Sequence, residues 1–280
     1  AHDGWWISPF QFMLDEKDNL VTYDYSTTRE TDLPERAKLL RRPLFGAERV
    51  LAVSESFAEL HRSCGVPCVE VMENGVSKLP SRRRVSSDSG RVRLAHIGGA
   101  TRHKGIHLVR NALVAGEFSK LELLLVDYSL PEDIVRKEHW GTTPVTVMAR
   151  IPQSQISELY SRVDVLLAPS IWPESFGLVT REALAAGTWV IASDRGAIGC
   201  EITEGKNGHV IDVSDYTALL EALEEVEANP DRYKKSPAFA LKIRTVLQQV
   251  DDLASIYDEI LEVSGKQGAG PGLGITNLEC

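Results

Sequence analysis

Two glutamates, Glu174 and Glu182, stand eight positions apart in a segment whose composition suits the binding of a phosphorylated sugar. The residues between them begin a predicted helix, and the free N–H groups at the start of a helix bind anions. Carboxylates accept hydrogen bonds from hydroxyl groups. A phosphate at the N–H groups of Phe176, Gly177 and Leu178, flanked by these carboxylates, would describe a sugar nucleotide. The alternatives are a solvated charge for Glu182 and a partner of the helix dipole for Glu174.

A glycine-rich segment with one lysine forms a second candidate site, between a predicted strand and a predicted helix. It consists of Gly98-Gly99-Ala100-Thr101-Arg102-His103-Lys104-Gly105. Glycines let backbone N–H groups approach a phosphate, while the helix start and Lys104 add positive potential. The segment is neither a Walker A loop nor a Gly-x-Gly-x-x-Gly dinucleotide loop. It predicts phosphate binding, and the alternative is a plain strand-to-helix turn with a solvated lysine.

Both segments depend on a predicted parallel sheet for their position. From about residue 92 onward, short β-branched runs alternate with longer amphipathic stretches, which is typical of a doubly wound α/β domain. Ligands of such sheets bind at the carboxyl ends of the strands, and each candidate segment directly follows a predicted strand. The predicted strands are 92–97, 121–127, 145–149, 163–168, 189–193 and 208–213, and the predicted helices are 105–115, 153–161, 177–186 and 215–228.

The first 77 residues predict a less complete unit. Strands are expected at 49–53 and 69–72, and helices at 33–42 and 54–63. Two strands cannot enclose a doubly wound core. The aromatic residues here that need burial are Trp5, Trp6, Phe10, Phe12 and Phe45. We therefore expect the C-terminal part of a domain whose beginning is absent, and exposed tryptophans that favour association with that missing part or with a second copy.

Composition and charge narrow the classes of protein. The 280 residues are 43% hydrophobic and 25% charged, with a formal net charge of −9, which is the balance of a globular protein. A pI near 5.4 argues against a general nucleic-acid binder, and no run has the length of a membrane-spanning helix. Four scattered cysteines predict reduced thiols and a cytoplasmic location. The histidines lack metal-ligand spacing, so we expect neither a metal nor another cofactor.

The segment around the two glutamates resembles the signature of the family 4 retaining glycosyltransferases, which have the GT-B fold. Glu174 and Glu182 match the family's Glu-x7-Glu pattern, within Pro-Ser-x-x-x-Glu-Ser-Phe-Gly-Leu-Val-x-x-Glu-Ala-Leu-Ala-Ala-Gly. Asp194-Arg195-Gly196 and Glu201 follow in the expected order. This combination of motifs is specific to the family.

Three shorter segments are similar to other parts of that family. Residues 98–105 resemble its Gly-Arg-x-x-x-x-Lys-Gly phosphate loop, and Asn74-Gly75-Val76 resembles the start of its interdomain linker. His2-Asp3 resembles the His-Asp that closes a strand of its acceptor domain near the reaction centre. The resemblance covers essentially residues 1–263, and it implies that preceding residues of the acceptor domain, including a glycine-rich loop, are missing.

The resemblance implies roles for the matched residues. Lys104 would neutralise the diphosphate leaving group, Glu174 would hold the transferred sugar, and His2 would lie beside the donor sugar; these three are the expected catalytic residues. Glu182 would hold the donor ribose. Donor binding is implied for Gly98, Gly99, Arg102, Glu174, Phe176, Gly177, Leu178 and Glu182.

The sequence departs from the family pattern at three positions. Gly99 stands where the family has a phosphate-binding arginine, so Arg102 or His103 must compensate or stabilisation of the leaving group is weaker. Val126-Asp127-Tyr128 replaces a Gly-x-Gly, which could alter the nucleotide side of the site. Trp189 replaces a proline and is expected in the core.

The implied fold is α/β of the GT-B type, with one complete doubly wound, Rossmann-like donor domain and the C-terminal part of a second, Rossmann-like acceptor domain. The expected boundaries are a partial acceptor domain at 1–77 and a nucleotide-sugar domain at 78–236, joined by a linker at 77–90. Residues 237–264 would form C-terminal helices that cross back to the first domain. Residues 265–280, rich in glycine, would be a flexible tail.

The implied activity is transfer of a sugar from a nucleoside diphosphate sugar, a UDP- or GDP-sugar, to a hydroxyl group with retention of the anomeric configuration. The acceptor is unknown and could be lipid-linked, as in polysaccharide or glycolipid biosynthesis. Two alternatives stay open: a non-catalytic nucleotide-sugar-binding fragment and a GT-B nucleotide-sugar epimerase. We expect no nucleic-acid partner.

A cluster of basic residues could touch a membrane. Arg36, Lys38, Arg41 and Arg42 lie near leucines and Phe45, and 82–84 is a run of three arginines. Such a surface could hold the anionic inner face of a membrane or a lipid-diphosphate acceptor. The interpretation we favour is an ordinary solvated surface.

Overall fold

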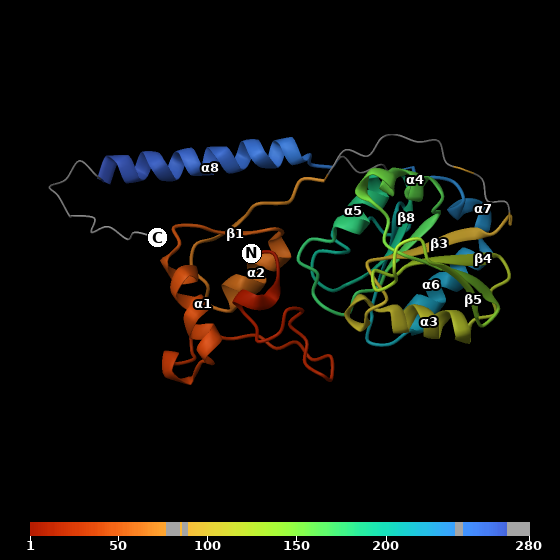
Figure 1. The fold of residues 1–280 in the computed structure, drawn as a ribbon, viewed down its shortest axis with the longest axis horizontal. Coiled ribbons are helices and arrows are strands. Elements are labelled where there is room, and N and C mark those ends of the chain that lie inside the picture. Colours follow the sequence, from red (N-terminus) through yellow and green to blue (C-terminus); the bar gives the residue numbers. More distant parts are fainter. Residues whose placement is uncertain (77–84, 86–88, 239–242, 268–280) are drawn as a thin grey trace.

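A seven-stranded sheet forms the core of the larger of two lobes in the computed structural model (Figure 1). The structure describes residues 1–76, 85, 89–238 and 243–267. The strand order is β5-β6-β4-β3-β7-β8-β9, and all neighbours are parallel except β5 and β6. The strands are β3 (Val92–Ile97), β4 (Leu121–Val126), β5 (Val135–Trp140), β6 (Thr143–Met148), β7 (Val165–Ala168), β8 (Trp189–Ser193) and β9 (Gly208–Ile211).

Helices cover both faces of this sheet because its strand residues are apolar on both sides. On one face, α3 (Ile106–Ala115) and α6 (Thr217–Ala228) pack against residues such as Leu94 and Leu123. On the other, α4 (Ile156–Ser161) and α5 (Leu178–Ala185) pack against residues that include Ala95 and Leu166. The predicted doubly wound architecture is confirmed. Short elements complete the lobe: η3 (Arg102–Lys104), η4 (Gln153–Gln155) and α7 (Pro230–Tyr233).

The edge strand β5 corrects the prediction of an all-parallel sheet. It pairs antiparallel with β6 through a tight connection at Gly141. Five of its six residues are exposed, and Arg136, Lys137 and Glu138 are charged. Hydrophobic patterning could not find this strand because an edge strand with one neighbour buries little of its surface.

The smaller lobe contains a parallel two-stranded sheet and two helices, as predicted. The strands are β1 (Val50–Ala52) and β2 (Val69–Val71), and the helices are α1 (Glu35–Gly46) and α2 (Glu55–Ser63), with η1 (Gly4–Trp6) and η2 (Glu30–Asp32) before them. Its core includes Ile7, Met13 and Phe57, and two residues of the larger lobe, Trp172 and Phe176, belong to the same cluster. The two lobes therefore share apolar packing.

Two features of this lobe differ from expectation. Trp5 and Trp6 are half-buried rather than exposed, and the Arg36 guanidinium lies over the Trp5 ring, 3.5 Å from its centroid. Phe10 stays exposed at 40%. The tryptophans therefore do not offer the apolar surface that we expected to favour association.

The long helix α8 (Val246–Gln267) returns to the smaller lobe (Figure 1). Gln249 Oε1 accepts a hydrogen bond from the backbone of Gly75, and Glu259 pairs with Arg49 at 2.7 Å. The helix starts at Val246, well after Pro237, and it includes 265–267 of the expected tail. Residues 268–280 and most of the expected linker lie outside the described residues, and the domain boundaries stay predictions.

Candidate active site

The two candidate segments meet at the carboxyl ends of two neighbouring parallel strands, β3 and β7. From β3 the chain continues to β4 on one side, and it later returns to β7 on the other. This is the switch point of the strand order, where open α/β sheets bind their ligands. The sequence prediction that both segments lie at one edge of the sheet is confirmed.

The first loop requires its glycines. Gly98 and Gly99 have φ angles of 138° and 92°, in the region that side chains disfavour. Gly105 has a φ of 77°, and a Cβ atom there would lie 1.9 Å from the carbonyl oxygen of Pro169. The backbone of the first loop therefore packs directly on the start of the second.

An ion pair joins the two loops. Lys104 Nζ lies 2.5 Å from Glu174 Oε1, and the Ser170 hydroxyl donates to the same oxygen at 2.7 Å. Glu174 is 7% exposed, whereas the Lys104 side chain keeps 24% of its surface open. A cation that is held by a buried carboxylate and still reaches solvent can approach a bound anion.

The backbone of Glu174 is fixed by a third segment. Ala197 N–H donates to the Glu174 carbonyl oxygen at 2.8 Å, and Glu174 forms an isolated β-bridge with Gly196. A Cβ atom at Gly196 would lie 2.5 Å from that carbonyl oxygen. Gly196 belongs to the Asp-Arg-Gly motif of the sequence, so its conformation explains the glycine of that motif.

The N-terminus of α5 lies directly after Glu174. Gly177 is its N-cap, with a φ of 78°, and no described side chain caps the helix. Buried Arg181 donates to the carbonyl oxygens of Phe176 and Ala197 and pairs with Glu201 at 3.3 Å. Burial lowers the pKa of this guanidinium. These contacts hold the strand-to-helix turn, and the first N–H groups of a helix are groups to which anions bind.

Glu182 lies one turn further along α5 and makes a separate set of contacts. Its carboxylate accepts hydrogen bonds from Gln153 and from the Tyr160 hydroxyl, both at 3.3 Å. Burial raises the pKa of Glu182, and these two hydrogen bonds oppose the rise. Burial and the nearby Glu182 carboxylate raise the pKa of Tyr160 well above its ordinary value. A carboxylate held this way is poised to accept hydroxyl hydrogen bonds.

An aromatic contact from the smaller lobe lies beside the ion pair. The Phe12 ring stacks on His103, with centroids 3.7 Å apart, and meets Trp172 edge-on at 5.3 Å. Lys104 Nζ is 5.6 Å from the Trp172 ring centroid. Burial, together with the Lys104 charge, lowers the pKa of His103 to about 4, and Glu174 opposes both effects. From the sequence alone, Phe12 is only a residue in need of burial.

Two expected site residues lie apart from this pair. The Arg102 guanidinium pairs with Asp18 of the smaller lobe, so one of the two residues expected to compensate for Gly99 is engaged between the lobes. His2 is exposed, and no described contact joins it to Lys104 or Glu174. Partial burial of the imidazole and the neighbouring chain terminus lower the pKa of His2, and Asp3 opposes them. Its expected catalytic role stays a prediction.

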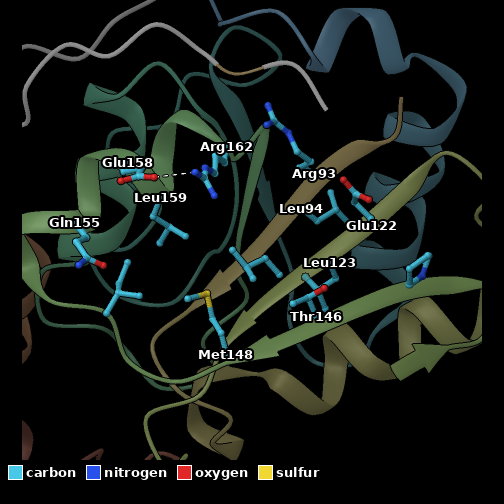
Figure 2. Close-up of a pocket in the computed structure, with 13 residues that line it drawn as sticks. Arg93, Leu94, Glu122, Leu123, Thr146, Met148, Gln155, Glu158, Leu159 and Arg162 are labelled. Atoms are coloured by element: carbon cyan, nitrogen blue, oxygen red, sulfur yellow. Dashed lines mark hydrogen bonds and ion pairs between the residues drawn. The ribbon is translucent and has the colours of Figure 1, made fainter. Parts of the chain in front are cut away.

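A groove elsewhere on the larger lobe contains none of the expected site residues. Figure 2 shows it between α4 and the open face of β4 and β6. The volume of this groove is about 410 Å³. Leu124, Thr146 and Met148 are half-buried here. The groove is open because β4 connects to β6 through the edge strand β5 and not through a covering helix.

Within the described ranges, no three histidine, cysteine, aspartate or glutamate side chains gather as metal ligands would. No helix among these residues combines the length and apolar character needed to cross a bilayer. Cys64, Cys68 and Cys200 are free thiols, and Cys64 is buried.

The chain is similar to known proteins in sequence and, separately, in fold. The family model "Glycosyl transferases group 1" matches residues 77–240, more than half of the chain. The phosphatidyl-myo-inositol mannosyltransferase of Mycobacterium leprae is 32% identical over 169 residues, which are 58% of this chain and 45% of that protein. The alpha-maltose-1-phosphate synthase of Mycolicibacterium smegmatis is 30% identical over 198 residues, which are 65% and 50%. The chain thus spans about half the length of these relatives.

The solved structures are similar in fold. Sucrose-phosphate synthase from Thermosynechococcus elongatus has a TM-score of 0.68 at 20% identity, covering 85% of this chain and 64% of that one. Anabaena Alr3699/HepE in complex with UDP and glucose has a TM-score of 0.64 at 18% identity, covering 83% and 68%. Identities this low support the fold alone.

Proposed function

Because the chain belongs to the family of glycosyl transferases group 1 and has the GT-B fold expected from its sequence, we propose that it is a glycosyltransferase. The proposed donor is a UDP- or GDP-sugar, the acceptor is a hydroxyl group, and the anomeric configuration is retained. One observation carries the proposal: the Lys104–Glu174 pair, with Ser170, lies where two parallel strands end and α5 begins. That position offers a cation, hydroxyl acceptors and helix N–H groups within one site.

The donor fits this arrangement group by group. The diphosphate would bind the backbone N–H groups of Gly98 and Gly99 and those of Phe176, Gly177 and Leu178, as anions do at glycine loops and helix starts. The Glu174 carboxylate would accept hydrogen bonds from the sugar hydroxyls, and Glu182 from the ribose. The complex of Alr3699/HepE with UDP and glucose, a protein of similar fold, supports a nucleotide-sugar donor.

The proposed reaction needs no protein base. The bond between the anomeric carbon and the diphosphate oxygen breaks, and its electron pair leaves with the diphosphate. The acceptor oxygen bonds to the anomeric carbon on the same face, and its proton passes to the departing diphosphate. Lys104 neutralises the charge that develops there, which is the electrostatic form of catalysis. His2 would lie at the acceptor side, and Arg102 would support the loop from its contact with Asp18.

The proposed acceptor is an inositol hydroxyl, because several relatives are named phosphatidyl-myo-inositol mannosyltransferase or D-inositol 3-phosphate glycosyltransferase. The lipid-linked form would bring the protein to the inner face of a membrane. In that case α1 would contact it, since Leu39 is 75% exposed beside exposed Arg42. We propose a cytoplasmic location, supported by the free thiols, and catalysis without a metal ion, supported by the cation that Lys104 supplies.

The test is donor consumption by the 280-residue chain with UDP-glucose or GDP-mannose. Each donor is incubated alone, with inositol 3-phosphate, and with vesicles that contain phosphatidylinositol; released nucleotide and product anomer are measured, with and without EDTA. Release that requires an acceptor and survives EDTA supports the proposal. Consumption without acceptor would indicate an epimerase or a hydrolase, and binding without consumption a nucleotide-sugar-binding protein. Either result would overturn the proposed transfer.

A further inference from the structure

Tyr128 is an aromatic residue at the mouth of the candidate site that the proposed donor contacts leave unused. It follows β4 and lies against the glycine loop after β3: a Cβ atom at Gly99 would be 3.7 Å from Tyr128 Cδ2. Its side chain is 51% exposed. The ring thus borders the loop proposed to hold phosphate and still offers half of its surface to a ligand.

The backbone that carries Tyr128 is held on both sides. Asp127 N–H donates to the Met148 carbonyl oxygen at 2.9 Å, which continues the pairing of β4 with β6. The Asp127 carboxylate accepts hydrogen bonds from Ser129 N–H at 2.9 Å and from its hydroxyl at 2.8 Å. Tyr128 is therefore an exposed aromatic residue on a fixed turn, not on a loose loop.

Two charged groups from other segments act on Tyr128. The Arg150 guanidinium, after β6, lies over the Tyr128 ring, 5.9 Å from its centroid. The Glu182 carboxylate of α5 lies close enough to act on the Tyr128 hydroxyl, whose pKa is raised by burial and by this charge and lowered by Arg150. A ring bordered by a phosphate loop, a guanidinium and a hydroxyl-accepting carboxylate has the neighbours that a nucleoside needs.

We propose that Tyr128 holds the donor nucleotide by stacking on its base, with Arg150 beside the same base. This inference rests on the proposed function, because it assumes that the diphosphate lies at Gly99 and the ribose at Glu182. With the diphosphate and the ribose in these positions, the base would extend toward the carboxyl ends of β4 and β6, where Tyr128 and Arg150 lie. Aromatic rings and guanidinium planes are the groups on which proteins stack bases.

The structure also defines the opposite possibility. A ring so close to Gly99 could instead occupy the space of the donor, as a side chain that blocks the site. The two possibilities predict changes of opposite sign when the ring is removed, because loss of a platform weakens nucleotide binding and loss of a block strengthens it.

The experiment is calorimetric titration of the chain and its variants with UDP, GDP, ADP and inorganic pyrophosphate. Tyr128→Leu is expected to weaken binding of the preferred nucleotide roughly tenfold, within the range of one lost base stack. Tyr128→Phe keeps the ring and should bind near the wild-type level. Pyrophosphate has no base, so its affinity should be the same in all variants. Tyr257→Leu, on exposed α8, is the matched control.

A spectroscopic signature separates stacking from a merely structural effect. Base protons of the bound nucleotide should shift upfield by ring current in the wild type and in Tyr128→Phe, and this shift should be absent in Tyr128→Leu. Equal or tighter nucleotide binding by Tyr128→Leu would overturn the inference and leave the proposed function standing. If the wild type binds no nucleotide, both fail; if it binds nucleotide but transfers no sugar, the transfer alone fails.

Discussion

The Phe12 ring of the smaller lobe stacks on the His103 ring of the larger lobe, with centroids 3.7 Å apart and ring planes 14° from parallel. His103 immediately precedes Lys104, whose ammonium group holds Glu174. Asp18, from the same loop as Phe12, pairs with Arg102. Three successive residues of the glycine-rich loop after β3 are thus fixed by partners, and two of those partners come from the other lobe. The relative position of the lobes and the position of Lys104 are therefore coupled.

Neutral His103 is expected to make stability depend on pH. Its folded pKa of about 4 lies below its ordinary value of 6.5, so the unfolded chain binds more protons between these values. Stability is therefore complete above about pH 6.5 and falls as the pH drops toward 4. His103→Phe keeps the stack, and its urea stability should fall less over that range. Because the pKa values of His61 and His96 are also lowered to about 4, the comparison uses the difference between wild type and variant. Identical pH profiles would contradict this account.

Lys104 is expected to act mainly on the chemical step. In Lys104→Ala, the turnover rate should fall about a hundredfold, the usual effect of removing one group that stabilises developing negative charge. The Michaelis constant for the donor should change much less. Lys206→Ala, at an exposed lysine away from the site, serves as the control. A normal turnover rate in Lys104→Ala would exclude the proposed role.

Gly105 should tolerate no side chain. The variant Gly105→Ala forces a Cβ atom against the Pro169 carbonyl oxygen, and we expect it to lose more than about 2 kcal/mol of unfolding free energy together with nucleotide binding. A substitution at Gly90 measures the backbone strain without the steric collision, since the φ of Gly90 is 69° and no atom lies near its Cβ position. Gly90→Ala should cost only about 1 kcal/mol, the strain of the left-handed conformation. Chemical denaturation of both variants is the measurement; equal losses would show that the contact between the loops does not matter.

Removing the Glu182 charge is expected to stabilise the folded chain and to weaken nucleotide binding. Burial raises its folded pKa, so the folded state is penalised as the pH rises through that value and the carboxylate becomes charged. Glu182→Gln removes the charge and can keep the contacts with Tyr160 and Gln153. We expect it to be more stable than the wild type at neutral pH, with no difference in acid, and to bind nucleotide roughly tenfold more weakly. Glu221→Gln, on the exposed face of α6, is the control, and unchanged nucleotide binding would exclude the ribose contact.

The sequence was sufficient to predict the elements that bury apolar residues. The strand at 92–97 agrees with β3 at both ends, because its inward residues and its flanking turns are both visible in the sequence. The meeting of Lys104 with Glu174 was also predictable in outline, since strand ends of a parallel sheet share one edge. Strand β5 was missed because its residues are exposed.

The contacts between loops could not be predicted from the sequence. Phe12 and His103 lie far apart in the chain, and no periodicity of either segment indicates that they meet. The pairing of Arg102 with Asp18 likewise depends on how the lobes come together. Tyr128 was noticed only as a departure from a motif, and its position beside Arg150 became visible in three dimensions.

The two edges of the large sheet bear on how the protein behaves at high concentration. An open strand edge is a template on which another chain can add a strand and begin to aggregate. At one edge, β5 presents Arg136-Lys137-Glu138 in succession, with five of its six residues exposed. At the other edge, the Glu204 carboxylate accepts a hydrogen bond from the backbone N–H of Val210 in β9 at 3.1 Å. Charge at one edge and an internal hydrogen bond at the other make both edges poor templates, which favours a dispersed protein over fibrous assemblies.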